Sequence, residues 1–252
     1  TVADEYPHLQ AISATINEEA LDILIKSDTV AGVFEDKEYS IFPTEETTLQ
    51  TSISVPAIGA LNAHTTYNLS GRNIVVAVLD TGIDYQHPAL GACPAINATC
   101  RVRGGYDFVN SDNDPLDDNG HGTHVAGIIG ANSSTLTGVA PQVQFLAYKV
   151  CNSFGSCPIS AILAGVDAAI ENNAQIISIS LGGEEQPNNG QSILSLALNQ
   201  AVAQGITVVV AAGNSGPSTG CVASPGDAQD VITVGNSNDK GTIDTSDDTI
   251  SS

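Results

Sequence analysis

The stretch Ile74-Val75-Val76-Ala77-Val78-Leu79-Asp80-Thr81-Gly82 decides the fold, because it is a continuously apolar run that ends in a polar turn. Such a run predicts a strand that is buried on both faces. Runs of this kind alternate with helical patterns along the chain: strands are expected at 74–79, 143–148, 176–181, 206–212 and 231–234, and helices at 123–132, 159–172 and 192–204. The alternation predicts an α/β fold, namely a doubly wound, mostly parallel sheet with helices on both faces.

Two polar residues follow predicted strand ends, where open α/β sheets bind their ligands. Asp80 follows the strand at 74–79, and Asn214 follows the strand at 206–212 in a glycine-rich turn. An aspartate in this place either caps a turn or orients a histidine by accepting a hydrogen bond from its Nδ1. An asparagine in such a turn is either a turn former or an amide donor to a developing oxyanion.

A histidine suited to this chemistry lies in Gly120-His121-Gly122-Thr123-His124, just before the apolar run 125–129. The pattern predicts a buried helix with His121 at its N-terminus. The helix dipole there disfavours the imidazolium, so it favours a neutral ring that can act as a base. We expect His124 to be a packed, hydrogen-bonded side chain, because the H-E-x-x-H arrangement of zinc sites is absent.

Two other classes of protein are disfavoured by the same residues. Asp80-Thr81-Gly82 is also a signature of aspartic proteases, with Asp244-Thr245-Ser246 as the candidate second copy. That class needs two lobes of β-hairpins, whereas this chain alternates strands and helices. A nucleotide-binding sheet is disfavoured because no G-x-G-x-x-G or Walker run follows a predicted strand.

Four runs together resemble, in their order and context, the subtilisin-like serine proteases (subtilases): Asp80-Thr81-Gly82, His121-Gly122-Thr123-His124, Ser180-Leu181-Gly182-Gly183 and Ala212-Gly213-Asn214. The resemblance covers residues 56–252. It implies that Asp80 orients His121, that His121 is the general base and acid, and that Asn214 is the oxyanion donor. It further implies a serine endopeptidase that cuts protein or peptide substrates through an acyl-enzyme, with no organic cofactor.

The resemblance also implies which residues line the substrate cleft: Ser180, Leu181, Gly182 and Gly213. The glycine pair that ends the run 180–183 leaves the backbone bare, so an extended peptide could pair with it as an added strand. Ser215 follows the oxyanion residue, and we expect Ala223 and Ser224 near the pocket floor. These neutral residues predict a pocket for apolar side chains.

The serine nucleophile of the family lies in a Gly-Thr-Ser run at a helix start, and no run in this chain matches it. Gly122-Thr123 is followed by His124, and Gly241-Thr242 is followed by Ile243. We therefore expect that the chain is truncated before the catalytic serine and is inactive alone. The alternative is a non-catalytic peptide-binding relative that keeps the cleft.

The N-terminal part resembles the C-terminal portion of a subtilase propeptide. Its pattern predicts a strand at 8–16, a helix capped by Asn17, and strands at 29–35 and 38–42. The resemblance implies three units: a propeptide fragment at 1–45, a linker at 46–55 and the catalytic domain at 56–252. It also implies that the propeptide occupies the cleft until the chain is processed within 47–54.

Composition restricts the partners and the compartment. The 252 residues carry 7 Lys and Arg against 28 Asp and Glu, for a formal net charge of -21. A surface of this sign repels phosphate, which disfavours nucleic acid and anionic membranes. No apolar run reaches the roughly 18 residues that span a bilayer. We expect a secreted monomer whose signal peptide lies outside this chain.

Two further predictions concern cysteines and calcium. Cys93 with Cys100, and Cys151 with Cys157, bracket short loops and could close local disulfides, although buried free thiols are the alternative; Cys221 is left over. Oxygen ligands are dense after residue 106, and the stretch 106–110 resembles the calcium-binding loop of some heat-stable subtilases, the alternative being a solvated acidic loop. The calcium ligands that this resemblance implies are Asp107, Asn110, Asp112 and Asp114.

Overall fold

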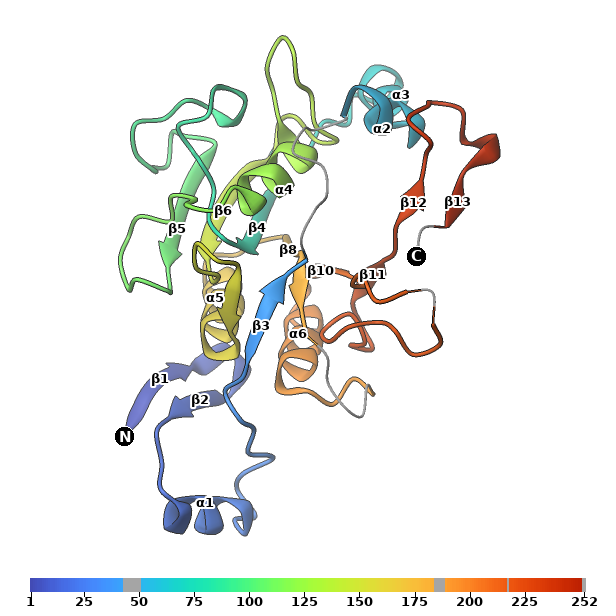
Figure 1. The fold of residues 1–252 in the computed structure, drawn as a ribbon. Coiled ribbons are helices and arrows are strands. Elements are labelled where there is room, and N and C mark those ends of the chain that lie inside the picture. Colours follow the sequence, from blue (N-terminus) through green and yellow to red (C-terminus); the bar gives the residue numbers. More distant parts are fainter. Residues whose placement is uncertain (43–50, 184–188, 217, 251–252) are drawn as a thin grey trace.

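A six-stranded parallel sheet forms the centre of the molecule in the structure, a computed structural model that describes residues 1–42, 51–183, 189–216 and 218–250 (Figure 1). Its strand order is β11-β10-β8-β4-β6-β5, and every neighbouring pair is parallel. The strands are β4 (Val75–Asp80), β5 (Val102–Asp107), β6 (Gln144–Lys149), β8 (Ile176–Ile179), β10 (Thr207–Ala211) and β11 (Ile232–Val234). The predicted parallel sheet is therefore confirmed.

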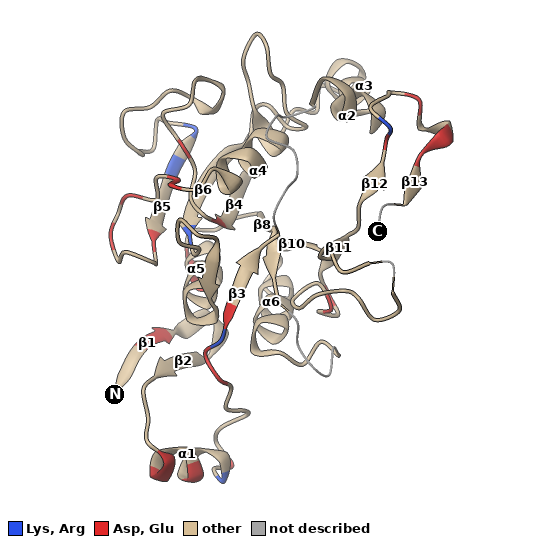
Figure 2. Cartoon of the chain, viewed as in Figure 1, with Lys and Arg blue, Asp and Glu red and all other residues tan. Residues whose placement is uncertain are grey.

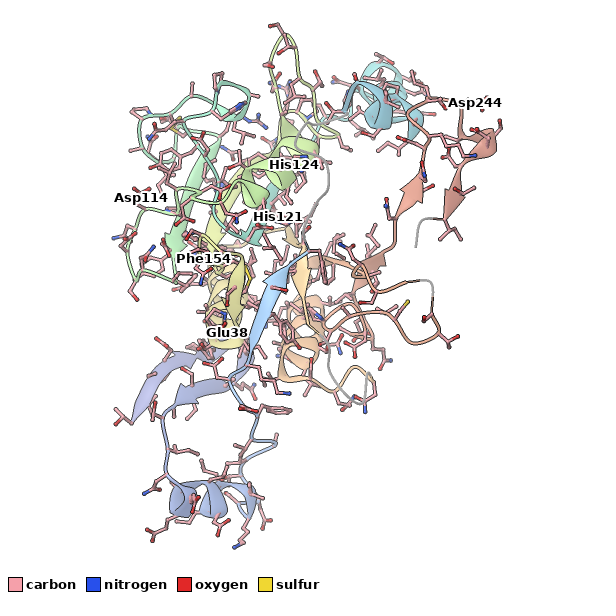
Figure 3. The ribbon with its side chains drawn as sticks, viewed as in Figure 1. Glu38, Asp114, His121, His124, Phe154 and Asp244 are labelled. Atoms are coloured by element: carbon pink, nitrogen blue, oxygen red, sulfur yellow. A yellow bond between two sulfur atoms is a disulfide. The ribbon has the colours of Figure 1, made fainter. Side chains whose placement is uncertain are left out.

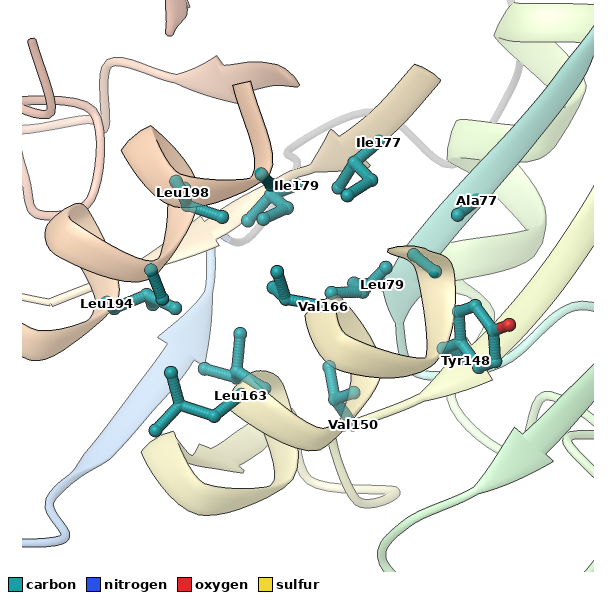
Figure 4. Packing of buried hydrophobic residues seen from close by; sticks show 14 of the residues in the cluster. Ala77, Leu79, Tyr148, Val150, Leu163, Val166, Ile177, Ile179, Leu194 and Leu198 are labelled. Atoms are coloured by element: carbon teal, nitrogen blue, oxygen red, sulfur yellow. The ribbon is translucent and has the colours of Figure 1, made fainter. Parts of the chain in front are cut away.

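Helices cover both faces of this sheet, as the doubly wound prediction requires. They are α4 (His121–Gly130), α5 (Ile159–Glu171) and α6 (Ile193–Ala203). Side chains of the central strand β4 alternate between the two faces, as a strand's period of two dictates. Ala77 and Leu79 pack into the cluster formed with α5 and α6 (Figure 4), whereas Val76 and Val78 join the cluster that includes Ala126 of α4.

The sequence prediction missed strand β5 and the two helices α2 (Thr51–Ala57) and α3 (Ala60–Tyr67). Strand β5 contains Arg103, Gly104 and Gly105, and it pairs on one side only, with β6. Helix α2 begins inside the expected linker at 46–55. The expected processing segment at 47–54 lies partly outside the described residues, since these resume at Thr51.

The N-terminal segment differs in part from the predicted elements. It contains β1 (Val2–Tyr6), the 3-10 turn η1 (Pro7–Leu9), β2 (Ala11–Ala14), α1 (Glu18–Ile25) and β3 (Glu38–Ile41). The predicted strand at 8–16 is thus shorter, and it pairs antiparallel with β1, which was not predicted. Asn17 caps α1 as expected, because its side chain accepts a hydrogen bond from the Ala20 N–H. The predicted strand at 29–35 is wrong, since this exposed segment is irregular.

The N-terminal segment is docked on the outer surface of α5. The Tyr6 hydroxyl donates to the Ser160 carbonyl, and the His8 N–H donates to Asp167 Oδ1 at 2.8 Å. Burial raises the pKa of Asp167, although the His8 N–H favours its charged form. Asp36 accepts from the Ser160 N–H at 2.9 Å and thereby caps the first turn of α5.

The remaining elements are short, with two or three residues each: η2 (Pro88–Leu90), β7 (Ser156–Pro158), β9 (Leu181–Gly182), β12 (Ser237–Asn238), η3 (Thr245–Asp247) and β13 (Thr249–Ile250). Both predicted disulfides are formed, Cys93–Cys100 and Cys151–Cys157, and Cys221 is a free thiol. Acidic side chains lie mainly on loops and on α1 (Figure 2). Within the described ranges, no helix combines the length and the apolarity that crossing a membrane requires.

Candidate active site

Asp80 and His121 form a buried pair at the carboxyl edge of the sheet. Asp80 is the last residue of β4 and His121 is the first residue of α4. Nδ1 of His121 lies 2.7 Å from Oδ1 and 2.9 Å from Oδ2 of Asp80. Because an ionised carboxylate only accepts hydrogen bonds, Nδ1 carries the proton and Nε2 is left as the basic nitrogen. Asp80 is only 1% exposed.

The start of α4 approaches the end of β4 closely enough to exclude any side chain at Gly122. A Cβ there would lie 2.1 Å from the Gly82 carbonyl and 3.1 Å from the Asp80 Cβ. The Thr81 hydroxyl accepts from the Gly122 N–H at 2.9 Å and ties the two turns together. The glycine after the histidine is therefore needed for the contact between Asp80 and His121.

Asp117 fixes the first turn of α4. Its Oδ2 accepts from the N–H and the hydroxyl of Thr123, and its Oδ1 accepts from the Thr81 hydroxyl and the Gly120 N–H. A carboxylate at a helix N-terminus satisfies N–H groups that have no partner within the helix. Asp117 thus positions the backbone on both sides of His121.

Several opposing contributions set the pKa of His121. Burial lowers it, but the hydrogen bond and charge of Asp80, a hydrogen bond to the Phe42 backbone and the charge of Asp117 together raise it above its ordinary value. These contributions oppose the expected effect of the helix dipole, which disfavours the imidazolium. A carboxylate at 2.7 Å outweighs the partial charge of a helix end.

Strand β3 is an extended segment near this pair, and another strand pairs with each of its two edges. It pairs antiparallel with β9, where Ser40 is opposite Gly182 and Ile41 is opposite Leu181. On its other edge it pairs antiparallel with β7. His121 lies at the end of α4 that faces the tip of β3 (Figure 3). The run 180–183 and the loop 151–157 therefore hold a peptide segment of the same chain between them.

Phe42, the residue after β3, is hydrogen-bonded through its backbone to His121. Its N–H donates to the Ser180 carbonyl at 3.5 Å. Its ring lies against two glycines, since a Cβ at Gly182 would be 2.8 Å from Phe42 Cζ and a Cβ at Gly213 would be 3.5 Å from it. The glycine at position 182 therefore gives the aromatic ring its space, and a Cβ at Gly213 would lie at ordinary contact distance from it. Ala223 also borders Gly213, with its Cβ 2.9 Å from that position.

Asn214 follows Gly213 and is exposed. It lies three residues after the end of β10 and next to the glycine that borders the Phe42 ring. The residues expected around the site are thus distributed over one edge of the sheet: Asp80 at the end of β4, Ser180 after β8, Asn214 after β10 and His121 on α4.

Lys149 is a buried cation beneath these turns. It is 1% exposed, and its Nζ donates to the carbonyls of Thr81 and Cys151 at 2.9 and 3.0 Å and to Asp118 Oδ1 at 2.5 Å. Since Lys149 is opposite Asp80 in the sheet register, it ties the turn after β4 to the loop before His121.

The predicted calcium ligands do not form a metal site. Asp107 accepts from the N–H groups of Val109 and Asn110 and from the Asn110 side-chain amide, while Asp112 accepts from the Asp114 N–H. The remaining carboxylate of this set, Asp114, accepts from a tyrosine hydroxyl. No group of three or more His, Cys, Asp or Glu side chains that could hold a metal occurs in the described part of the chain. The carboxylates of Asp107 and Asp112 accept hydrogen bonds within their own turns, so this arrangement does not fit a bound calcium ion.

The Asp80–His121 pair thus lies at the carboxyl edge of an α/β sheet, with β3 of the same chain close to the imidazole. The sequence profile of the subtilase family matches residues 71–251, and the chain belongs to this family.

Curated relatives extend the similarity to most of the chain. It is 37% identical over 239 residues to subtilisin E of Bacillus subtilis, a match that covers 93% of this chain and 58% of the relative. The minor extracellular protease Vpr of the same organism is 36% identical, over 92% of this chain and 28% of the relative. A cold-adapted subtilisin-like serine proteinase of known structure has a TM-score of 0.57 and 35% identity, and the match covers 67% of this chain and 56% of that one.

Three contributors to the site were missed in the sequence: Phe42, Asp117 and Lys149. Phe42 follows a short alternating run whose place in the cleft depends on tertiary docking. Lys149 ends an apolar strand. Its position could have indicated a structural role, because a cation at the end of a buried strand needs hydrogen-bond acceptors around it.

Proposed function

We propose that the complete protein is a serine endopeptidase made as a zymogen, with Asp80 and His121 as two members of its catalytic triad. The observation that carries this proposal is the buried Asp80–His121 pair with the Phe42 backbone hydrogen-bonded to the imidazole. A base in contact with a bound peptide backbone is positioned for chemistry at a peptide carbonyl.

In this mechanism each residue has a separate role. Asp80 holds Nδ1–H and stabilises the imidazolium. His121 Nε2 takes the proton of a serine hydroxyl as that oxygen attacks the peptide carbonyl, and then gives it to the leaving amine. The Asn214 amide donates to the oxyanion, a contribution worth about 10²–10³ in kcat in subtilisin. No serine of this chain lies in a Gly-Thr-Ser run, so the complete protein is proposed to supply the nucleophile.

The N-terminal segment is proposed to be the C-terminal part of a propeptide, and β3 with Phe42 is proposed to block the cleft. Proline is the next residue after Phe42. The proline ring includes the backbone nitrogen that would be the leaving group if the bond after Phe42 were cut. Proline also restricts the conformation of the residue before it. We therefore propose that the bond after Phe42 resists cleavage and that processing takes place within 47–54.

The proposed enzyme acts outside the cell as a monomer on protein or peptide substrates with an apolar side chain in the Phe42 pocket. Two formed disulfides support an oxidising compartment. A relative is named an extracellular protease.

A second candidate function, a non-catalytic peptide-binding protein, is favoured by one observation: β3 is paired through its backbone on both edges. The two functions are separated by a burst assay. The complete gene product should release a stoichiometric burst of alcohol from an activated ester, and the 252-residue chain should release none. A complete protein without a burst that still binds peptides would contradict the endopeptidase.

A further inference from the structure

Tyr39 of β3 fills a closed pocket three residues before Phe42. Its side chain is 3% exposed, although β3 is a short strand at the molecular surface. A Cβ at Gly183 would lie 2.7 Å from the Tyr39 ring, so a glycine at this position gives the ring its space. The pocket therefore accepts a large planar side chain.

A polar atom lies at the bottom of this pocket. The Tyr39 hydroxyl donates to Oγ of Ser224 at 3.0 Å. Ser224 is 0% exposed, and its backbone exchanges two hydrogen bonds with Gly183 at 2.9 and 3.0 Å. The hydroxyl of Ser224 is thereby fixed in position and separated from solvent while Tyr39 is bound.

The hydroxyls of Ser224, Ser192 and Ser195 form a hydrogen-bonded chain that ends at the Asp227 carboxylate. This carboxylate sets the direction of each hydrogen bond in the chain. Asp227 Oδ1 can only accept when ionised, so Ser195 donates to it, at 2.8 Å. Ser192 donates to Ser195 at 2.8 Å. Ser192 has then used its proton, so the 2.8 Å contact between Ser192 and Ser224 requires Ser224 to donate.

Ser224 therefore offers an acceptor, and not a donor, to whatever enters the pocket. A tyrosine hydroxyl supplies the missing proton. A phenylalanine ring of the same shape leaves the lone pair of Ser224 buried without a donor, which is a cost that the tyrosine complex does not carry. The hydroxyl chain thus makes the pocket selective for one aromatic residue over another.

We propose that Ser224, oriented through Ser192 and Ser195 by Asp227, makes this protease prefer tyrosine to phenylalanine at the fourth residue before the bond it cuts. The substrate class is then an extended peptide with tyrosine at that residue and a large apolar residue beside the cut. This inference rests on the proposed endopeptidase function and on Phe42 marking the residue beside the cut.

The expected preference is about tenfold in kcat/KM. One neutral hydrogen bond contributes a net free energy that corresponds to roughly that factor. A larger factor is not expected, because the two peptides differ by a single neutral hydrogen bond.

The test compares two peptides that differ only at this residue, Tyr-Ser-Ile-Phe and Phe-Ser-Ile-Phe, each followed by a chromogenic amide. The complete, processed protein should cleave the tyrosine peptide about tenfold faster. Ser224→Ala should bring the ratio close to one, and the exposed Ser134→Ala should leave it unchanged. Equal rates for the two peptides in the unsubstituted protein would overturn the inference and leave the endopeptidase function intact.

A second measurement does not depend on activity. Urea unfolding of the 252-residue chain with Tyr39→Phe, Ser224→Ala and both changes forms a double-mutant cycle. The two changes should be coupled by about tenfold in the unfolding constant, about 1.4 kcal/mol. Independent effects would overturn the hydroxyl pocket. Absence of cleavage of both peptides, together with a coupled cycle, would overturn the endopeptidase function alone.

Discussion

Replacing Lys149 by methionine should destabilise the folded chain through the turns that carry Asp80 and His121. The methionine fills the same space but donates no hydrogen bond. The carbonyls of Thr81 and Cys151, which accept from Nζ at 2.9 and 3.0 Å, would lose this donor. Each buried carbonyl left without a donor costs about 1–3 kcal/mol.

The sum for two carbonyls is about 2–6 kcal/mol, and two further terms modify it. Removing a buried cation returns part of the cost of its desolvation. The ion pair with Asp118 adds little, because that side chain is 47% exposed. We therefore expect a loss of about 2–4 kcal/mol in the free energy of unfolding, with a fall in Tm of about 5–15 °C.

Urea unfolding followed by circular dichroism measures this loss directly. The matched control is Lys26→Met, since Lys26 is 76% exposed and 3.9 Å from Asp22; it should change the free energy by less than about 0.5 kcal/mol. A loss below about 1 kcal/mol for Lys149→Met would refute the reasoning that the two carbonyls depend on this ammonium.

Three other outcomes are expected. Because the pKa of His121 is raised, its protonation stabilises the fold fully below the unfolded value near pH 6.5, and this contribution is lost as the pH rises through the folded value; a profile of unfolding free energy against pH that is identical in His121→Ala would contradict the assignment. Cys151→Ser with Cys157→Ser should cost about 2 kcal/mol, the loop-closure entropy of a short loop, and an unchanged urea midpoint would show that this bond contributes nothing. A chelator should leave the Tm unchanged, because Asp107 and Asp112 are used within their own turns; a fall would show that a metal is bound after all.

The central sheet could be predicted from the sequence because its strands are apolar on both faces. The run at 74–79 differs from β4 by one residue at each end. The contact between Asp80 and His121 could also be predicted, because the aspartate ends a strand and the histidine starts a helix at the same edge of the sheet.

Other features depended on tertiary contacts that leave little local pattern. Strand β1 contains Asp4 and Glu5 and is exposed on most of its length, so it has no apolar alternation. The place of Phe42 is set by the pairing of β3 with β9, and no spacing within residues 38–42 shows this. Calcium ligands could not be assigned from the sequence, because spacing alone does not distinguish oxygens aimed at an ion from oxygens that accept from neighbouring N–H groups.

The most direct test of the central claim is the peptidase activity of the complete protein with and without the His121 imidazole. His121→Ala should lower kcat by about 10⁶-fold, the loss that subtilisin shows for its histidine. His87→Ala is the control, since His87 caps the 3-10 turn η2; it should retain activity. Turnover by the His121→Ala protein within about tenfold of the unsubstituted protein would contradict the assignment of Asp80 and His121 as the catalytic pair.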